Sequence, residues 1–266
     1  NLRQLGPTPP QPDPPIPNRV LTQGSPAWSP DGTKIAFASS RAWDRGGLDI
    51  YVVNADGSDL QRLTDDPSFE ESPRWSPDGS MIAFEVHGDG GDRYGNIYVM
   101  NSDGSERRRL VEATGAGDPN WSPDGEWIAY SDGRFCCAVH IVRVDGTDRR
   151  DLSGTGFSAN WPRWSPDGSM LAWSAHSDGG SFDGLLILDR ATDDVRHISS
   201  LAGSIEWSPD GRWIVVARHA FDTSGNQLGE AGLYVLRPDG SDERLLLDIP
   251  VDEYDTHIDW RPATTD

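Results

Sequence analysis

The sequence is poor in the features that mark several common classes of protein. Only two of its 266 residues are cysteine, so a disulfide framework is excluded. Apolar residues make up 35% of the chain, and no run approaches the roughly 18 residues of a membrane-spanning helix. The 23 basic residues face 43 acidic ones, which gives a net charge of −20 and little to neutralise phosphates. We therefore predict no membrane span and no nucleic-acid partner.

Recognisable catalytic motifs are also missing. The chain has no Gly-x-Ser-x-Gly elbow, no glycine-rich phosphate loop and no His-Glu-x-x-His. Cys136 and Cys137 are adjacent and bridge only through a strained ring, so free thiols are the default, with a vicinal disulfide or an interchain bridge as alternatives. His87, His176 and His219 each lie twelve residues after a repeated tryptophan, which we interpret as loop packing rather than a zinc site.

An internal repeat is the strongest positive signal. The pentapeptide Trp-Ser-Pro-Asp-Gly begins at Trp28, Trp75, Trp121, Trp164 and Trp207, and a degraded copy begins at Trp260. Each unit has the same order: a short strand into the tryptophan, a turn, an apolar strand, a loop, a third strand, an Asp-Gly turn and a fourth strand. In the second unit we expect the first three strands at 72–75, 81–84 and 96–100; in the first unit we expect the fourth at 60–64. Four strands in about 45 residues, repeated, predict an all-β β-propeller.

The turn aspartates have a structural interpretation. Nine of them occupy equivalent positions in the two kinds of turn, and we expect their side chains to accept backbone N–H bonds there. They are Asp31, Asp56, Asp78, Asp103, Asp124, Asp145, Asp167, Asp210 and Asp239.

The repeat resembles that of the TolB-like, WD-type propellers of bacteria over roughly residues 19–262. The resemblance is specific for the fold and implies little about function, because such propellers serve as binding platforms, as gates on peptidases and as enzymes. We divide the chain into a proline-rich N-terminal arm at 1–18, the propeller at 19–262 and a tail at 263–266.

The two ends of the repeat do not match. Five complete blades are predicted, plus an incomplete sixth with strand-like segments at 19–22 and 257–260. A truncated chain, a five-bladed ring with two spare strands, and a six-sector ring that borrows strands all fit. The segment Asn1, Leu2, Arg3, Gln4 and Leu5 resembles an outer strand and precedes seven prolines within 7–17. This stiff tether suggests strand addition to another copy; an ordinary linker is the favoured alternative.

Variable loops on a rigid scaffold are where binding usually resides. We expect loops at 65–72, 112–118 and 153–160, among others, on one face, and most of the net negative charge falls in such loops. Exposed aromatics beside carboxylates suit a protein partner with a basic or cationic surface. The predicted partner-binding residues are Trp43, Asp65, Asp66, Phe69, Glu70, Glu71, Tyr94, Asp252, Glu253 and Tyr254.

A hard cation such as calcium is a further expectation for the central channel, since calcium takes six to eight oxygen ligands. The candidate ligands are Glu71, Asp118, Asn160, Asp255 and His257, although solvated carboxylates are the favoured interpretation.

These patterns predict a non-catalytic interaction scaffold that binds a protein or copies of itself. A glycan-active hydrolase or lyase, with two opposed acids beside a sugar-stacking aromatic, is one alternative. A gate or sensor module of a larger protein is another. The sequence begins at Asn1 without a signal sequence, so we expect a processed extracytoplasmic protein, periplasmic or secreted.

Overall fold

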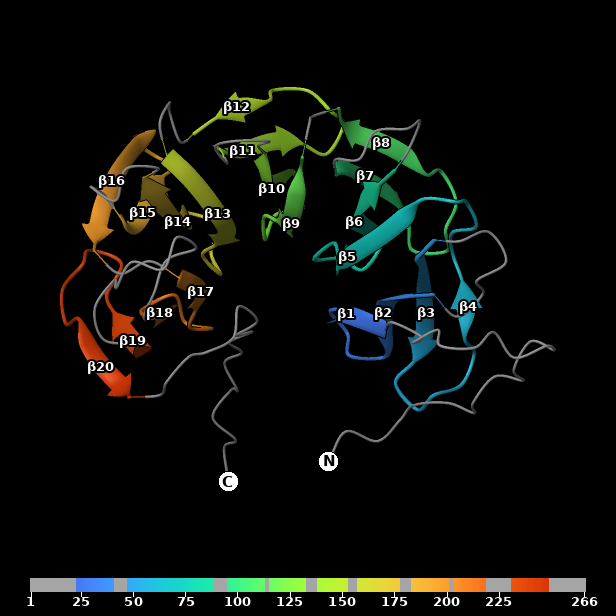
Figure 1. Ribbon diagram of the computed structural model, residues 1–266, viewed down its shortest axis with the longest axis horizontal. Coiled ribbons are helices and arrows are strands. Elements are labelled where there is room, and N and C mark those ends of the chain that lie inside the picture. Colours follow the sequence, from blue (N-terminus) through green and yellow to red (C-terminus); the bar gives the residue numbers. More distant parts are fainter. Residues whose placement is uncertain are drawn as a thin grey trace. The chain divides into compact units, whose positions relative to one another are not determined.

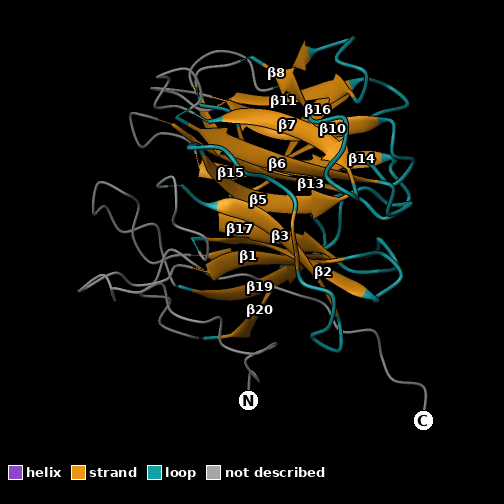
Figure 2. Cartoon of the chain, turned by 90° about the vertical axis from the view of Figure 1, so that its right-hand side faces the viewer, coloured by secondary structure: helices purple, strands orange, loops and turns teal. Residues whose placement is uncertain are grey.

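The structure is a computed structural model, and it describes residues 23–40, 47–88, 95–112, 115–132, 138–152, 157–177, 183–200, 203–218 and 231–248. Regular secondary structure in these segments consists of strands (Figure 2). No helix in the described segments is long and apolar enough to cross a membrane. The chain divides into two compact units, Asn1–Pro119 and Asn120–Asp266.

Two four-stranded sheets belong to the first unit, and their strands pair in chain order (Figure 1). The first sheet contains β1 (Gln23–Trp28), β2 (Lys34–Ser39), β3 (Asp49–Asn54) and β4 (Gln61–Arg62). The second contains β5 (Phe69–Trp75), β6 (Met81–His87), β7 (Asn96–Asn101) and β8 (Arg108–Val111).

Three further sheets follow the same order. They contain β9 (Gly117–Trp121), β10 (Trp127–Asp132), β11 (Ala138–Arg143) and β12 (Arg150–Asp151); β13 (Phe157–Trp164), β14 (Met170–Ser177), β15 (Asp183–Asp189) and β16 (Asp194–Ser199); and β17 (Gly203–Trp207), β18 (Ile214–Arg218), β19 (Gly232–Leu236) and β20 (Arg244–Leu247). The five predicted four-stranded blades are therefore confirmed. The arm at 1–18 and the segments at 19–22 and 257–260 lie outside the described residues.

The side chains of the Ser-Pro-Asp-Gly motif hold the turn between the first two strands of each sheet. In the first copy, the Ser29 hydroxyl accepts the backbone N–H of Lys34 at 2.9 Å and donates to Asp31 at 2.6 Å. Asp31 also accepts the backbone N–H of Thr33 at 3.0 Å, and Gly32 takes a φ of 69°. All nine turn aspartates accept the backbone N–H two residues further on, as predicted. These hydrogen bonds favour the ionised carboxylate and hold the pKa of Asp31 at about 2.

In three of the sheets the first strand is bulged around a proline that stands two residues before the motif tryptophan. The register shifts between Glu71 and Arg74 in β5, around Pro73. The same shift surrounds Pro26 in β1 and Pro162 in β13. Proline donates no ladder hydrogen bond, and a bulge accommodates it.

The fifth sheet provides the contrast. Its β17 has Ile205 at the proline position and pairs with β18 without any shift. The extra residue of a bulge also adopts left-handed φ values: Ser72 has a φ of 51° and Trp161 one of 55°.

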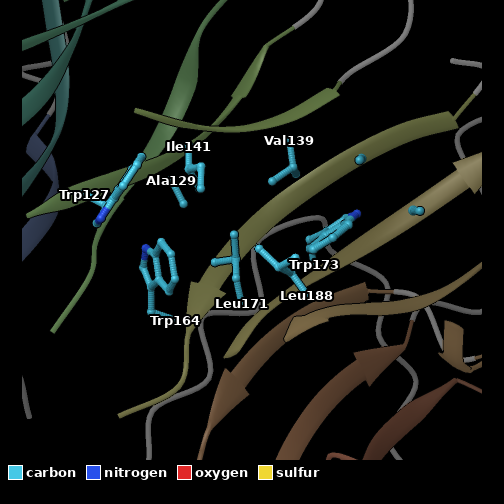
Figure 3. Packing of buried hydrophobic residues seen from close by; sticks show 10 residues of the cluster. Trp127, Ala129, Val139, Ile141, Trp164, Leu171, Trp173 and Leu188 are labelled. Carbon is cyan, nitrogen blue, oxygen red and sulfur yellow. The ribbon is translucent and has the colours of Figure 1, made fainter. Parts of the chain in front are cut away.

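Apolar residues of neighbouring sheets pack on each other within each unit. In the first unit, Ile50 and Val52 of β3 share a cluster with Trp75 and Phe84 of the next sheet. In the second unit, side chains of β10 and β11 meet Leu171 and Trp173 of β14 (Figure 3). Burying a side chain the size of Leu171 contributes about 1.5–3 kcal/mol, so these contacts between sheets stabilise the stack.

The predicted strand limits need two corrections. The first strand of the second sheet begins at Phe69 rather than at 72, so Phe69, Glu70 and Glu71 lie in β5 and not in a loop. In the same way, Asp118 lies in β9 and Asn160 in β13. In β5 and β13 the bulge explains the difference, because it lets the strand continue on both sides of the proline. The fourth strand of the first sheet is shorter than predicted and is only Gln61–Arg62.

Candidate interaction site

Half of the predicted partner-binding residues lie in one stretch of the first unit. Asp65 and Asp66 precede β5, and Phe69, Glu70 and Glu71 form its beginning. The remaining predicted site residues, apart from Asp118 and Asn160, fall outside the described residues: Trp43, Tyr94, Asp252, Glu253, Tyr254, Asp255, His257 and the segment Asn1, Leu2, Arg3, Gln4 and Leu5.

The entry into β5 is held by backbone contacts with the start of β3. The Glu70 N–H donates to the carbonyl of Leu48 at 2.9 Å, and Leu48 forms a parallel bridge with Phe69. Asp66 accepts the backbone N–H of Ser68 at 3.0 Å, which shapes the bend before the strand. The positions of the side chains from Asp66 to Phe69 are therefore set by the fold.

Glu70 and Glu71 are adjacent in the sequence but belong to different clusters, because successive side chains of a strand point to opposite faces. Glu70 is fully buried. Its Oε1 lies 2.7 Å from Nη2 of Arg107, whose Nη1 also contacts Asp66. The Arg107 guanidinium lies over the rings of Tyr98 and Phe84, at 5.0 and 5.6 Å from their centroids. Arg107 thus connects the start of β5 and the bend before it with the side chains of β6 and β7 in the same sheet.

Electrostatics in this buried cluster follow from burial and from the shared arginine. Burial raises the pKa of Glu70 to about 8, although the Thr64 hydroxyl and the charge of Arg107 act to lower it. Burial also acts to raise the pKa of Asp66, but hydrogen bonds from Ser68 and Arg107 outweigh it and the pKa is lowered. Asp66 therefore carries the negative charge beside Arg107, and Glu70 holds its proton more tightly than an exposed glutamate.

The repeat shows that the fold itself does not demand Glu70. The position five residues before the motif tryptophan is Ala116 in the third unit of the repeat and Ala159 in the fourth, both buried. The arginine has a counterpart: Arg149 lies over the Tyr130 ring, but its carboxylate partner is Asp132 of the same sheet, at 2.7 Å. In the described residues, Arg107 thus takes an acid from the connection before β5, whereas Arg149 takes one from its own sheet.

Asp65 belongs to a second ion pair network. Nη2 of Arg62 lies 3.0 Å from the buried Asp49 and 3.4 Å from Asp65. The Asp65 side chain keeps 59% of its surface exposed, and Phe69 is 41% exposed. The segment therefore exposes an aromatic residue and a carboxylate, while its other acids, Asp66 and Glu70, contact the half-buried Arg107.

The other face of β5 carries the second cluster, which we call the β5–β6 acidic face and which consists of Phe69, Glu71, Glu85 and His87. Phe69 pairs with His87 across the strands, and Glu71 pairs with Glu85. Nε2 of His87 lies 3.3 Å from Oε2 of Glu85, while Oε1 of Glu85 accepts the backbone N–H of Asp118 at 2.9 Å. The hydrogen bond to Glu85 raises the pKa of His87, and burial offsets part of this effect. The sequence suggested only loop packing for His87. In the structure, its imidazole also interacts with the Glu85 carboxylate.

The candidate cation ligands within the described residues come from both units, Glu71 and Asp118 from the first and Asn160 from the second. Glu71 and Asp118 both lie next to Glu85, whereas Asn160 in β13 pairs with Ser174 in β14. No group of three or more His, Cys, Asp or Glu side chains in the described segments could hold a metal ion. With Asp255 and His257 outside these segments, the calcium site stays a prediction.

Three residues of these clusters were missed as site residues from the sequence: Arg107, Glu85 and His87. Arg107 follows an Asp-Gly turn by three residues, where Leu60 and Glu243 stand in other repeats, so the variation within the repeat was a usable signal. Glu85 stands ten residues after its tryptophan, where other repeats have Ala38, Ser131, Ser174 and Ala217.

Comparison with known proteins settles the family. The model of the TolB beta propeller domain matches residues 15–182, which is more than half of the chain. The chain belongs to the TolB-like β-propeller family. No curated protein matches its sequence.

Solved structures agree with this assignment for the fold. TolB from Acinetobacter baumannii is similar with a TM-score of 0.61 and 23% identity, over 83% of this chain and 53% of that one. A putative TolB from Agrobacterium tumefaciens gives 0.64 and 20%, over 86% and 82%. An oligogalacturonate lyase in complex with manganese gives 0.51 and 15%, over 84% and 76%. This TolB-like chain spans about half the length of the Acinetobacter protein, and identities this low establish the shared fold alone.

Proposed function

We propose that this TolB-like chain is a non-catalytic interaction scaffold outside the cytoplasm that binds a protein partner with a basic surface through the segment Asp65–Phe69 and the neighbouring part of β5. The observation that carries the proposal is the buried contact of Glu70 and Asp66 with Arg107. It fixes the backbone that presents Asp65 and Phe69 to solvent. A pre-formed aromatic anchor loses little conformational entropy when a partner binds.

Three further observations support the proposal. Buried charges carry a large desolvation cost, and the equivalent alanines show that the fold does without Glu70. The exposed residues near it are acidic and aromatic, in a chain whose net charge is −20. The extracytoplasmic location rests on the similarity to TolB.

Affinity capture tests this function. Tagged protein is exposed to an envelope extract of the bacterium that produces it, and the bound proteins are identified by mass spectrometry. The Phe69→Ala variant should lose the partner that wild type retains. Leu246→Ala is the matched control, because Leu246 is also an exposed apolar residue, at 45%, but lies in β20. Equal recovery with Phe69→Ala and with wild type would contradict the proposal, as would the absence of any specific partner.

A second candidate function, self-assembly, is supported by the exposure of Trp28. The motif tryptophans Trp75, Trp121, Trp164 and Trp207 are 4–9% exposed, whereas Trp28 is 59% exposed. A surface of this kind suits a sheet supplied by another copy, with the segment Asn1–Leu5 as the added strand. Light scattering of the full chain and of a chain lacking residues 1–18 tests this. An assembly state that does not change on deletion removes the candidate.

The predicted glycan-active enzyme and the gate or sensor module stay predictions. The oligogalacturonate lyase shares the fold at 15% identity, which says nothing about the chemistry of this chain.

A further inference from the structure

The β5–β6 acidic face contains two carboxylates at directly opposed positions. Glu71 and Glu85 are direct cross-strand partners. Like charges placed opposite one another in a sheet are destabilising. Glu85 has the His87 imidazole and the Asp118 N–H as partners, but Glu71 makes no hydrogen bond or ion pair with any residue that the structure describes. Its charge helps to raise the pKa of His87, so among the described residues the two carboxylates share one imidazole.

The other sheets show that this pair is particular to β5 and β6. The equivalent cross-strand pair is Gly24 with Ala38 in the first sheet and Asn160 with Ser174 in the fourth. It is uncharged in both. The same pair of strands therefore forms without carboxylates in two other sheets. The electrostatic repulsion between Glu71 and Glu85 is not required for folding, which points to a role in binding.

The surroundings of the pair fit a flat cation. Phe69 is 41% exposed and lies two residues from Glu71 on the same face of β5. Two glycines pack closely on the other members of the face: a Cβ at Gly117 would lie 3.3 Å from the Glu85 carboxylate, and one at Gly95 would lie 3.0 Å from the His87 ring, so Glu85 and His87 need these positions to lack a side chain. An aromatic face next to a carboxylate is the environment that a guanidinium prefers, because it stacks on the ring and donates two parallel hydrogen bonds.

We propose that the β5–β6 acidic face binds an arginine side chain of the protein partner, with Phe69 stacking on the guanidinium and Glu71 accepting its hydrogen bonds. Glu85 acts as a positioning residue: its hydrogen bonds to His87 and Asp118 hold its carboxylate beside the site, where it adds negative potential. The proposal rests on the interaction function above and identifies the chemistry of the partner.

Two blocked peptides that differ only in charge test the proposal directly. One contains two arginines among glycines and serines, and the other has citrulline in their place. With full-length protein at about 0.15 M salt, where unspecific surface attraction is screened beyond ~8 Å, the arginine peptide should bind in calorimetry. It should shift the amide resonances of residues 69–71 and 85–87. The citrulline peptide should do neither.

Variants separate a specific site from the general acidity of the chain. Glu71→Gln should weaken the arginine peptide about tenfold, as expected for one lost charge-assisted hydrogen bond. Phe69→Ala should weaken it roughly three- to tenfold. Asp194→Asn removes the same charge from an exposed site in β16 and should leave the affinity unchanged.

Several outcomes would overturn the arginine site: no binding, resonance shifts elsewhere, or equal weakening by Asp194→Asn and Glu71→Gln. The capture experiment keeps this failure distinct from failure of the scaffold function. If Glu71→Gln still captures the partner that Phe69→Ala loses, the scaffold function stands and the arginine site does not.

Discussion

The indole Nε1–H of Trp207 donates a hydrogen bond of 3.0 Å to the backbone carbonyl of Arg163, the residue just before the preceding motif tryptophan. Trp75 makes the same bond to Ala27, at 3.1 Å. Trp164 is equally buried, yet its indole N–H has no acceptor among the described residues. The repeat thus joins neighbouring sheets by one directional contact in addition to apolar packing.

This difference predicts unequal effects of the same substitution. Trp207→Phe and Trp164→Phe remove similar apolar area, but only the first also breaks a hydrogen bond. We expect Trp207→Phe to cost on the order of 1 kcal/mol more in the free energy of unfolding than Trp164→Phe. Urea unfolding of both variants measures the difference. Equal losses would show that the indole bond contributes nothing.

A second prediction concerns the buried Glu70. Because its folded pKa, about 8, lies above its ordinary value of 4.5, the folded state binds the proton more tightly than the unfolded state. Wild-type stability should therefore fall as the pH rises from about 4.5 to about 8, and Glu70→Gln should lack this part of the pH dependence. Chemical unfolding across this range, compared between the two proteins, gives the slope. A difference in stability that stays constant over the range would refute the raised pKa.

A third prediction concerns His87, whose pKa is raised in the folded state by the hydrogen bond to Glu85. The stabilisation is fully present below the ordinary histidine value of 6.5 and is lost as the pH rises through the folded pKa. His87→Gln should thus be less stable than wild type at about pH 6 and close to it at about pH 9. The melting temperatures of both proteins at the two pH values test this pH dependence. A variant that is equally destabilised at both pH values would indicate lost packing instead.

A fourth prediction compares two copies of the same turn. Asp124 accepts the Glu126 N–H and also lies 3.2 Å from Nη1 of Arg190, in the next sheet of its unit. Asp210 has the same turn bond, but its arginine, Arg212, is 4.0 Å away and largely exposed. Asp124→Asn should therefore lower the melting temperature more than Asp210→Asn.

Acid should remove the difference between these two variants. Both carboxylates have lowered pKa values, so their stabilisation is present above the ordinary aspartate value and is lost as the pH falls through the folded pKa. Thermal unfolding of the pair at about pH 7 and at about pH 3 measures it. Equal melting temperatures at neutral pH would exclude a contribution from Arg190.

Local sequence features account for the regular parts of the fold. Each Ser-Pro-Asp-Gly copy contains the hydroxyl, the carboxylate and the positive-φ glycine that its turn needs, so the turns and the number of blades could be predicted. The strand limits were harder, because Pro73 suggests a strand start when read locally. Its tolerance inside β5 depends on the bulge and on pairing with β6.

The site was predictable only in part for the same kind of reason. Asp65, Asp66, Glu70 and Glu71 form an evident acidic segment in the sequence, and they were predicted as one surface. Nothing local shows that Glu70 turns inward to an arginine 37 residues further on, while Glu71 turns toward Glu85. Side-chain alternation splits the segment, and that alternation begins where β5 begins.

By itself, the sequence determined the repeat, the turns and the acidity of this TolB-like chain, because these depend on interactions within a few residues and on composition. Only the tertiary structure decided which acids are buried and which partners they have. Arg107 reaches Asp66 across 41 residues, and Glu85 of β6 lies opposite Glu71 of β5. Burial and pairing between strands are properties of the packed sheets. Only folding therefore decides that Glu70 is buried against Arg107 while Glu71 lies on the β5–β6 acidic face.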